Sequence, residues 1–274
     1  MIPILQARNL SPLVRWFRLE APEISQKARA GQFVICRADE TGERIPLTIA
    51  DFDGDRTIEI VVQDAGAGTH RINQLQAGDA FLNVAGPLGR PSEIENFGTV
   101  VCVGGGVGIA PVYPIARALK QAGCRIISIL GARNEDLIFW EDRFEAFSEK
   151  VIVTTDDGSR GRKGVVTGPL KEMLEGGAAV DRVIAIGPAI MMKFVSLTTA
   201  PRHVKTIVSL NSIMLDGTGM CGGCRVSVNG KTQFVCVDGP EFDGHQVDFD
   251  ILMDRLAAYQ EEEHECRLKE RNHS

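Results

Sequence analysis

The stretch "TVVCVGGGVGIAPVYPIARALKQAG", from Thr99 to Gly123, decides the fold. Its apolar, β-branched start is typical of a buried strand, and the residues from Gly108 onward predict a helix that Gly123 ends. A glycine-rich turn joins the two. A strand that leads through a tight turn into a helix is the repeating unit of parallel sheets, so we expect an α/β domain here.

The same alternation continues toward the C-terminus and predicts one parallel sheet with helices on both faces. The expected strands are "RIISIL" (125–130), "KVIVTT" (150–155), "RVIAI" (182–186) and "KTIVSL" (205–210). The expected helices lie around 136–149, from Thr167 onward, and at 190–198.

Upstream, the chain has the composition of short strands and turns. "TIEIVVQ" (Thr57–Gln63) alternates in part, and "DAFLNVAGPLG" (Asp79–Gly89) ends in a Gly/Pro turn. We therefore expect an antiparallel barrel or sandwich over residues 1–95. The predicted domains that follow are an α/β domain over 96–210, a cysteine-containing segment over 211–247 and a helical tail over 248–274.

The composition is that of an ordinary soluble protein. The 274 residues are 44% hydrophobic and 24% charged, and the net charge of −6 argues against nucleic acid as a partner. No secretion signal or membrane-spanning run is visible, so we expect a cytoplasmic protein without membrane insertion.

Three of the seven cysteines lie in one segment with the pattern D-x4-C-x2-C-x11-C, formed by Asp216, Cys221, Cys224 and Cys236. Plant-type [2Fe–2S] sites have C-x4-C-x2-C and a distant fourth cysteine, so Asp216 stands at the first ligand position. The Asn229-Gly230 pair predicts a hairpin that returns Cys236 to the loop. We expect these four residues to bind a [2Fe–2S] cluster, and zinc is the alternative. The other cysteines are expected to be core thiols (Cys36, Cys102 and Cys124) or to have no visible partner (Cys266).

The glycine-rich turn, Gly104, Gly105, Gly106 and Gly108, suits a pyrophosphate because backbone N–H groups and a helix N-terminus meet there. It departs from the standard G-x-G-x-x-G fingerprint, since Ile109 stands where the last glycine is expected. A tight turn without a ligand is the alternative.

Three segments together resemble the ferredoxin–NADP reductase superfamily, in which a flavin barrel precedes a nicotinamide domain. They are "RIPLTIAD" (Arg44–Asp51), "GAGTHRINQLQAGD" (Gly66–Asp79) and "GGGVGIAPVYP" (Gly104–Pro114). The resemblance implies that Thr48 is the catalytic neighbour of flavin N5, although Arg44 is one residue farther from it than in the usual R-x-Y-S motif. The other residues implied for FAD are Arg44, Pro46, Leu47, Gly66, Gly68 and Thr69. Those implied for NAD(H) are Gly104, Gly105, Gly106, Gly108, Ala110, Pro111, Asp156, Asp157, Gly187, Pro188 and Met191.

Near the adenosine ribose, the acidic pair Asp156 and Asp157 would repel a 2′-phosphate, whereas Arg160, Arg162 and Lys163 would attract one. NADP therefore stays possible beside NAD. Met191 and Met192 have core packing as an alternative role.

The cysteine segment narrows the resemblance to two related groups. One is the electron-transfer subunit of dihydroorotate dehydrogenase, and the other is the small subunit of NADH-dependent reduced ferredoxin:NADP oxidoreductases, also described as a sulfide dehydrogenase subunit. The first group carries a cysteine where this chain has Asp216, which favours the second. The resemblance implies FAD, a [2Fe–2S] cluster and NAD(H) as cofactors. It also implies a larger flavin/iron–sulfur oxidoreductase subunit as partner and ferredoxin as an indirect one. The tail is expected to be a docking surface or a solvated cap.

Overall fold

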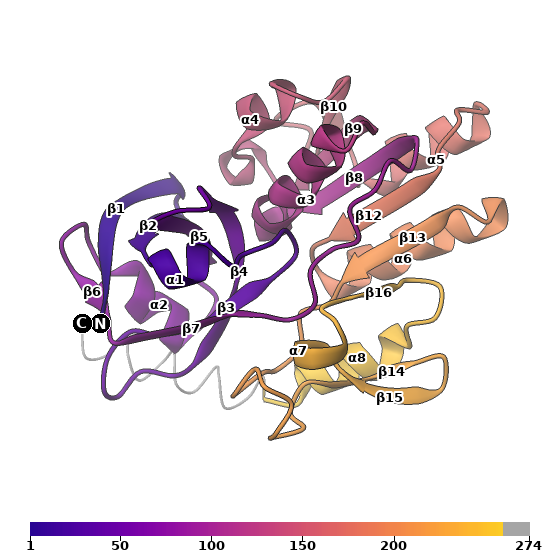
Figure 1. Cartoon of the computed structure of the whole chain (residues 1–274). Coiled ribbons are helices and arrows are strands. Elements are labelled where there is room, and N and C mark those ends of the chain that lie inside the picture. The colour runs from indigo at the N-terminus through magenta and orange to yellow at the C-terminus, as the bar shows by residue number, and fades with distance from the viewer. Residues whose placement is uncertain (260–274) are drawn as a thin grey trace.

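The computed structural model describes residues 1–259 and contains two large sheets and a small C-terminal hairpin (Figure 1). The N-terminal sheet and the central sheet lie side by side, and the C-terminal hairpin lies below the central sheet. No helix within residues 1–259 is long and apolar enough to cross a membrane.

The N-terminal sheet is an antiparallel, nearly closed barrel with strand order β6-β1-β2-β5-β4-β3-β7. Apolar side chains fill it because alternate residues of each strand point inward, and Phe17, Leu19, Ile58 and Ile60 are fully buried. The predicted strand at Thr57–Gln63 is confirmed, and the one at 79–89 divides into two. The elements are β1 (Ile2–Ser11), β2 (Val14–Glu20), α1 (Pro22–Ser25), β3 (Phe33–Arg37), β4 (Ile45–Phe52), β5 (Thr57–Gln63), α2 (Ala67–Asn73), β6 (Ala80–Phe81) and β7 (Asn83–Leu88).

The central sheet has the order β11-β10-β9-β8-β12-β13-β16, and every pair except β13–β16 is parallel. The predicted α/β domain is thus confirmed. Its strands are β8 (Thr99–Gly105), β9 (Arg125–Ala132), β10 (Lys150–Thr155), β11 (Arg162–Lys163), β12 (Arg182–Ile186), β13 (Lys205–Ser209) and β16 (Glu241–Asp243). Its helices are η1 (Gly106–Gly108), α3 (Ile109–Gln121), η2 (Glu135–Leu137), α4 (Glu141–Glu145), α5 (Thr167–Glu175), α6 (Ala189–Thr199) and η3 (Ala200–Arg202).

Alternation along β8 separates the two faces of this sheet. Val100 and Cys102 pack with α3, α4 and the barrel strands β2 and β5. Val101 and Val103 pack with α5, α6 and the C-terminal segment. One hydrophobic core therefore continues from the α3 face into the barrel and joins the barrel to helix α3.

The C-terminal segment contains the predicted hairpin, β14 (Arg225–Val228) and β15 (Lys231–Phe234), followed by α7 (Val235–Asp238) and α8 (Phe249–Ala257). Asn229 and Gly230 both have positive φ, as the two-residue turn requires. Sequence reasoning missed β16, which pairs antiparallel with β13 and so joins this segment to the central sheet. The domain limits drawn from the sequence stay predictions.

The helix predicted over 136–149 is much shorter in the structure. A 3-10 turn and the short α4 replace it, and Trp140 between them has φ 59°. Phe139 and Trp140 are both buried in the core on the α3 face, which a continuous amphipathic helix at this place does not achieve. Tertiary packing overrides local helix propensity here.

Candidate nucleotide, flavin and cluster sites

The glycine turn lies where the strand order of the central sheet reverses. β9 continues the sheet on one side of β8, and β12 lies on the other. Because β8 and β12 are parallel, the turn after β8 and the Gly187-Pro188 turn after β12 leave the sheet at the same edge. Open α/β sheets bind ligands at such a switch point, so this edge is the candidate nucleotide site.

Close packing restricts two glycines of the turn, Gly108 by backbone atoms and Gly105 by a flexible side chain. A Cβ on Gly105 would lie 2.2 Å from Met191 Sδ, and one on Gly108 would lie 2.1 Å from the Ile186 carbonyl oxygen. Gly106, with φ 55°, has nothing within 4 Å of its Cβ position, so its backbone is open to an approaching group. The alternative of a tight turn without a ligand accounts for Gly105 and Gly108, but it does not account for the open space at the Cβ position of Gly106.

The other predicted residues of this site lie around the same turn. Ala110 and Pro111 form the first turn of α3, and Ala110 is buried. Of the two methionines, Met192 is a core residue that is 1% exposed, whereas Met191 packs against Gly105 and Gly187. The structure thus brings the strand β8 turn and the strand β12 turn together through Met191.

The predicted adenosine loop follows β10 at the same edge of the sheet. Asp157 accepts hydrogen bonds from Ser159 N (2.9 Å) and Oγ (2.7 Å), and these bonds lower its carboxyl pKa. Asp156 is exposed. The neighbouring Arg160 is paired with Glu141 at 2.5 Å, and Arg162 pairs with Glu172 at 2.7 Å. Two of the three cations that could bind a 2′-phosphate are therefore already partnered.

The two predicted flavin segments meet on the barrel. Thr48 and Leu47 lie on β4 opposite Phe33 and Val34 of β3, and Arg44 precedes β4 as an exposed residue. A Cβ on Gly68 would lie 2.7 Å from Glu43 Oε2, so the start of α2 lies against the segment that carries Arg44.

Thr69 organises the start of α2, since its hydroxyl accepts hydrogen bonds from the N–H groups of Ala65 and Gly66, both at 2.9 Å. Gly66 itself has nothing within 4 Å of its Cβ position. No hydrogen bond of the Thr48 hydroxyl is found within residues 1–259. An open glycine, an exposed arginine and a hydroxyl without a protein partner fit a flavin with its phosphates.

The cysteine loop brings only two of the four predicted ligands together. Cys224 and Cys236 are each 1% exposed, with their sulfur atoms 3.2 Å apart, whereas Cys221 is exposed. Asp216 accepts hydrogen bonds from Thr218 N and Cys221 N, each at 2.9 Å. No cluster of three or more potential metal ligands is found within residues 1–259.

The chemistry of these donors nevertheless fits an iron–sulfur cluster, in which anionic side chains bind the iron cations. The hydrogen bond from the Thr218 N–H group, and then that from the Cys221 N–H group, lower the pKa of Asp216, so this carboxylate is ionised at neutral pH. Burial, and then the neighbouring Cys224, raise the pKa of Cys236, so its thiol needs a metal to lose its proton. The N–H groups of Gly223 and Cys236 point at the sulfurs of Cys221 and Cys224. Such N–H donors stabilise thiolate ligands.

The remaining cysteines behave as predicted where the structure describes them. Cys36, Cys102 and Cys124 are buried, and burial raises the pKa of the Cys36 thiol. Cys266 and the charged end of the predicted tail lie outside the described residues.

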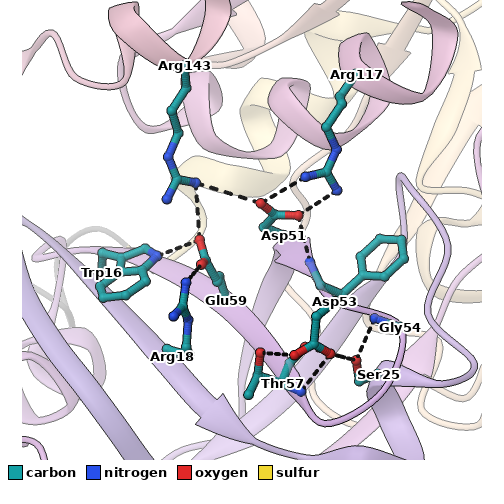
Figure 2. Close-up of polar contacts among 11 residues, drawn as sticks. Trp16, Arg18, Ser25, Asp51, Asp53, Gly54, Thr57, Glu59, Arg117 and Arg143 are labelled. Atoms are coloured by element: carbon teal, nitrogen blue, oxygen red, sulfur yellow. Dashed lines mark hydrogen bonds and ion pairs between the residues drawn. The ribbon is translucent and has the colours of Figure 1, made fainter. Parts of the chain in front are cut away.

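Sequence reasoning missed a charged network at the junction of the two large sheets (Figure 2). Asp51 of β4 binds Arg117 of α3, and Arg143 of α4 binds Glu59 of β5. Asp51 ends the quoted flavin segment Arg44–Asp51, but nothing in that segment or elsewhere in the sequence indicates its partner. The only signal was the occurrence of two acids in apolar barrel strands, which does not identify their partners.

A barrel with two flavin segments, a parallel sheet with a glycine turn at its switch point and a cysteine loop define an iron–sulfur flavoprotein oxidoreductase of the ferredoxin–NADP reductase type. The profile of the iron–sulfur cluster binding domain of dihydroorotate dehydrogenase B matches residues 211–248, and that of the oxidoreductase NAD-binding domain matches residues 102–197. The chain belongs to the family of dihydroorotate dehydrogenase B electron-transfer subunits. Its cofactors are NAD(H), FAD and a [2Fe–2S] cluster, so the iron–sulfur prediction is confirmed over the zinc alternative.

Relatives cover most of this chain. A Thermotoga maritima homolog of the electron-transfer subunit of dihydroorotate dehydrogenase B (NAD(+)) is 51% identical over 90% of this chain and 87% of its own. An uncharacterized Clostridium beijerinckii protein from the adh 3′ region is 44% identical over 98% and 94%.

Among solved structures, one of the NADH-dependent reduced ferredoxin–NADP oxidoreductase superposes with a TM-score of 0.92. It is 48% identical and covers 98% of this chain and 97% of that chain. Phthalate dioxygenase reductase, at 17% identity, superposes with a TM-score of 0.60 over 86% of this chain and 93% of its own, and it shows the fold alone.

Proposed function

We propose that this chain passes electrons between NAD(H) and a larger flavin/iron–sulfur partner subunit, in an electron-bifurcating ferredoxin:NAD(P) transhydrogenase. The observation that carries the proposal is Asp216 at the first position of D-x4-C-x2-C-x11-C, where dihydroorotate-type subunits carry cysteine. The similarity to the NADH-dependent reduced ferredoxin–NADP oxidoreductase over nearly the whole chain supports it. Ferredoxin would then exchange electrons with the partner rather than with this chain, and we place the complex in the cytoplasm.

When bound together, the cofactors supply the redox chemistry: a hydride carrying two electrons passes from NADH to FAD with uptake of one proton, and electrons leave singly through the cluster. The chain's own residues bind and orient these groups. On the nucleotide side, the glycine turn and the N-terminus of α3 would bind the pyrophosphate, with Gly187, Pro188 and Met191 beside the nicotinamide. Asp156 and Asp157 would bind the adenosine ribose.

On the flavin side, Thr48 would lie beside N5, flanked by Pro46 and Leu47, while Arg44 and the Gly66–Thr69 turn would bind the phosphates. Asp216, Cys221, Cys224 and Cys236 would ligate the cluster. The pairing of Arg160 with Glu141 and of Arg162 with Glu172 favours NAD(H) over NADP(H), because the carboxylates already neutralise both cations.

The second candidate function is electron transfer as a subunit of a dihydroorotate dehydrogenase, which the descriptions of the family and of the Thermotoga maritima relative favour. Anaerobic purification from the native source separates the two. A partner with its own iron–sulfur clusters, and NADH-dependent coupling of reduced ferredoxin to NADP, would support the transhydrogenase. A partner that reduces NAD with dihydroorotate would select the second function and exclude the first.

The ligand assignment predicts opposite results for two substitutions of Asp216. Asp216→Cys should keep the cluster with a shifted reduction potential, because a thiolate replaces a carboxylate ligand. Asp216→Ala should weaken or abolish cluster binding. The substitution removes the ligand and also the oxygens that accept hydrogen bonds from the N–H groups of Thr218 and Cys221. EPR spectra and potentiometric titration measure both effects, and Asp254→Ala, on the exposed surface of α8, is the control. Unchanged spectra in both Asp216 variants would place the fourth ligand elsewhere.

A further inference from the structure

Two acids stand opposite each other on the barrel surface that faces the nucleotide domain. A bulge in β4 between Ile49 and Asp51 shifts the register, so that Asp51 pairs across the strands with Glu59 of β5. Bulges redirect a side chain, and like charges directly opposite on a sheet destabilise it. The barrel alone therefore carries an unfavourable pair that cations must neutralise.

Two of the neutralising cations come from the nucleotide domain (Figure 2). Arg117 of α3 binds Asp51 with two contacts, 2.6 Å and 3.1 Å, as a guanidinium fork. Arg143 of α4 lies between the acids, 3.1 Å from Glu59 and 3.8 Å from Asp51. Within the barrel, Glu59 also accepts hydrogen bonds from Trp16 and Arg18.

The two arginines are themselves held in place. The Arg143 guanidinium lies 4.2 Å from the ring centre of Trp140 and 5.5 Å from that of Tyr113, and Arg117 lies 5.4 Å from Tyr113. The side chain of Asp51 is only 16% exposed. Partly buried, two-contact charge pairs have better defined geometry than fully exposed ion pairs, which contribute little.

The network joins the elements that carry the two reacting cofactors. Asp51 shares strand β4 with Thr48, and Arg117 shares helix α3 with the glycine turn at its start. About 12 Å of helix separates Arg117 from that turn at 1.5 Å per residue, so a small rotation about the pair displaces the nucleotide. The apolar core that spans the same junction holds the domains together without the pair.

We infer that Asp51, with Arg117 and Arg143, forms a positioning set for hydride transfer between NADH and FAD, fixing β4 relative to the start of α3. The inference rests on the proposed function. Misplacement of reacting groups by about 1 Å can cost roughly a hundredfold in rate. The set acts through the spacing of the cofactors and touches neither of them.

The test is Asp51→Asn, which keeps the shape of the side chain and removes its charge. Anaerobic stopped-flow measurements give the rate constant of flavin reduction at saturating NADH, and the long-wavelength charge-transfer absorbance of the flavin–nicotinamide complex reports their stacking. We expect the rate constant to fall about tenfold or more and the band to weaken, with the KM for NADH changed less than about twofold. Arg117→Lys keeps the charge without the fork and should give an intermediate loss.

The combined variant Asp51→Arg with Arg117→Asp should restore part of the rate and the band. Glu20→Gln is the matched control, because it breaks an ion pair of 2.6 Å with Arg56 on the surface of the barrel domain, with both partners in that domain. If the Asp51→Asn protein loses its flavin, the rate constant and the absorbance band of Arg117→Lys serve as the test instead.

Suppose that NADH reduces the wild type normally and that the variants have a lower melting temperature but an unchanged rate constant and absorbance band. That result would overturn only this inference. A wild type that NADH does not reduce would instead contradict the proposed function, and this inference with it.

Discussion

The junction between barrel and nucleotide domain and the cysteine loop are both built from ionisable groups, but their charges are balanced differently. At the junction, Asp51 and Glu59 each have arginine partners within the chain. In the loop, Asp216 accepts hydrogen bonds from the backbone N–H groups of Thr218 and Cys221, and the sulfurs of Cys224 and Cys236 face each other; no arginine or lysine pairs with them within residues 1–259.

The pKa directions follow from this difference. Burial alone would raise the pKa of Glu59, but the hydrogen bonds from Arg18 and Trp16 and the charge of Arg143 outweigh it and lower the pKa. At Cys236, burial and Cys224 raise the pKa, and the backbone hydrogen bond from Gly219, which lowers it, is too weak to offset them. The chain therefore completes the junction by itself, whereas the loop is completed by metal, whose binding then contributes to loop stability.

The largest predicted effect breaks the loop while leaving the junction intact. Cys236→Ser should remove the cluster completely, because the substitution deletes a buried thiol beside Cys224. Flavin content and flavin reduction by NADH should persist, since the predicted flavin and nucleotide residues lie outside the cysteine loop. Iron and acid-labile sulfide analysis, the visible spectrum and anaerobic reduction by NADH measure these outcomes.

Cys36→Ala is the control for this experiment, because Cys36 is an equally buried thiol that packs in the barrel core, separate from the core that contains Cys224 and Cys236. It should keep both cofactors. Two irons per chain in the Cys236→Ser protein, with the visible spectrum of the wild type unchanged, would show that this thiol is not a ligand. Loss of flavin together with the cluster would show that the two regions are not independent.

This contrast also explains what the sequence could predict. Strand and helix alternation predicted the central sheet, and Asn229-Gly230 predicted the hairpin, because these signals are local. The partnership of Asp51 with Arg117 depends on residues far apart in the chain that meet only after the two sheets pack. No spacing rule identifies such a pair.

Local signals failed in two places where tertiary contacts decide the structure. Trp140 interrupts the predicted helix because its ring is buried among other aromatic residues. The short β16 is too brief to be recognised alone and forms by pairing with β13. The cysteine motif was the reverse case, since its spacing indicated the cluster although the ligands do not converge in the structure.

The second prediction concerns the strand that connects the two regions. Glu241 of β16 accepts a hydrogen bond from Ser92 Oγ. Burial raises its pKa from 4.5 to about 7, because the opposing influence of Ser92 and Arg182 is smaller and Glu93 adds to the rise. Between pH 4.5 and 7, the folded protein keeps a proton that the unfolded chain releases.

The free energy of unfolding should therefore fall as pH rises through this window, by up to about 3 kcal/mol from this group. Glu241→Gln should flatten the dependence and raise stability above pH 7. Denaturant unfolding of the variant and wild type at pH 5, 6, 7 and 8, spanning the window, measures the slope. Parallel slopes for the two proteins would mean that Glu241 is ionised in the folded state across the range.

The smallest predicted effects sharpen the comparison by testing one glycine of the central sheet's glycine turn against one glycine of the cysteine loop. In Gly108→Ala, the new Cβ would lie 2.1 Å from the Ile186 carbonyl oxygen, inside a packed contact of two strand ends, and backbone must move. Overpacking of this kind costs about 1 to 3 kcal/mol, which should lower the melting temperature by several degrees. The variant should also bind NADH more weakly, because the glycine turn shifts.

Gly219→Ala meets a softer constraint, because the atoms nearest its Cβ, at 3.2 Å, belong to the Val237 side chain, and the strain comes from φ 86°. A left-handed conformation costs an alanine about 1 to 2 kcal/mol, which the loop can relieve by opening locally without unfolding the sheets. The melting temperature should therefore change little while the cluster is lost faster to a chelator. Thermal melts and chelator kinetics on both variants test this. An equal fall in melting temperature would show that the loop unfolds together with the central sheet. The loop would then not be a separate region that metal binding completes.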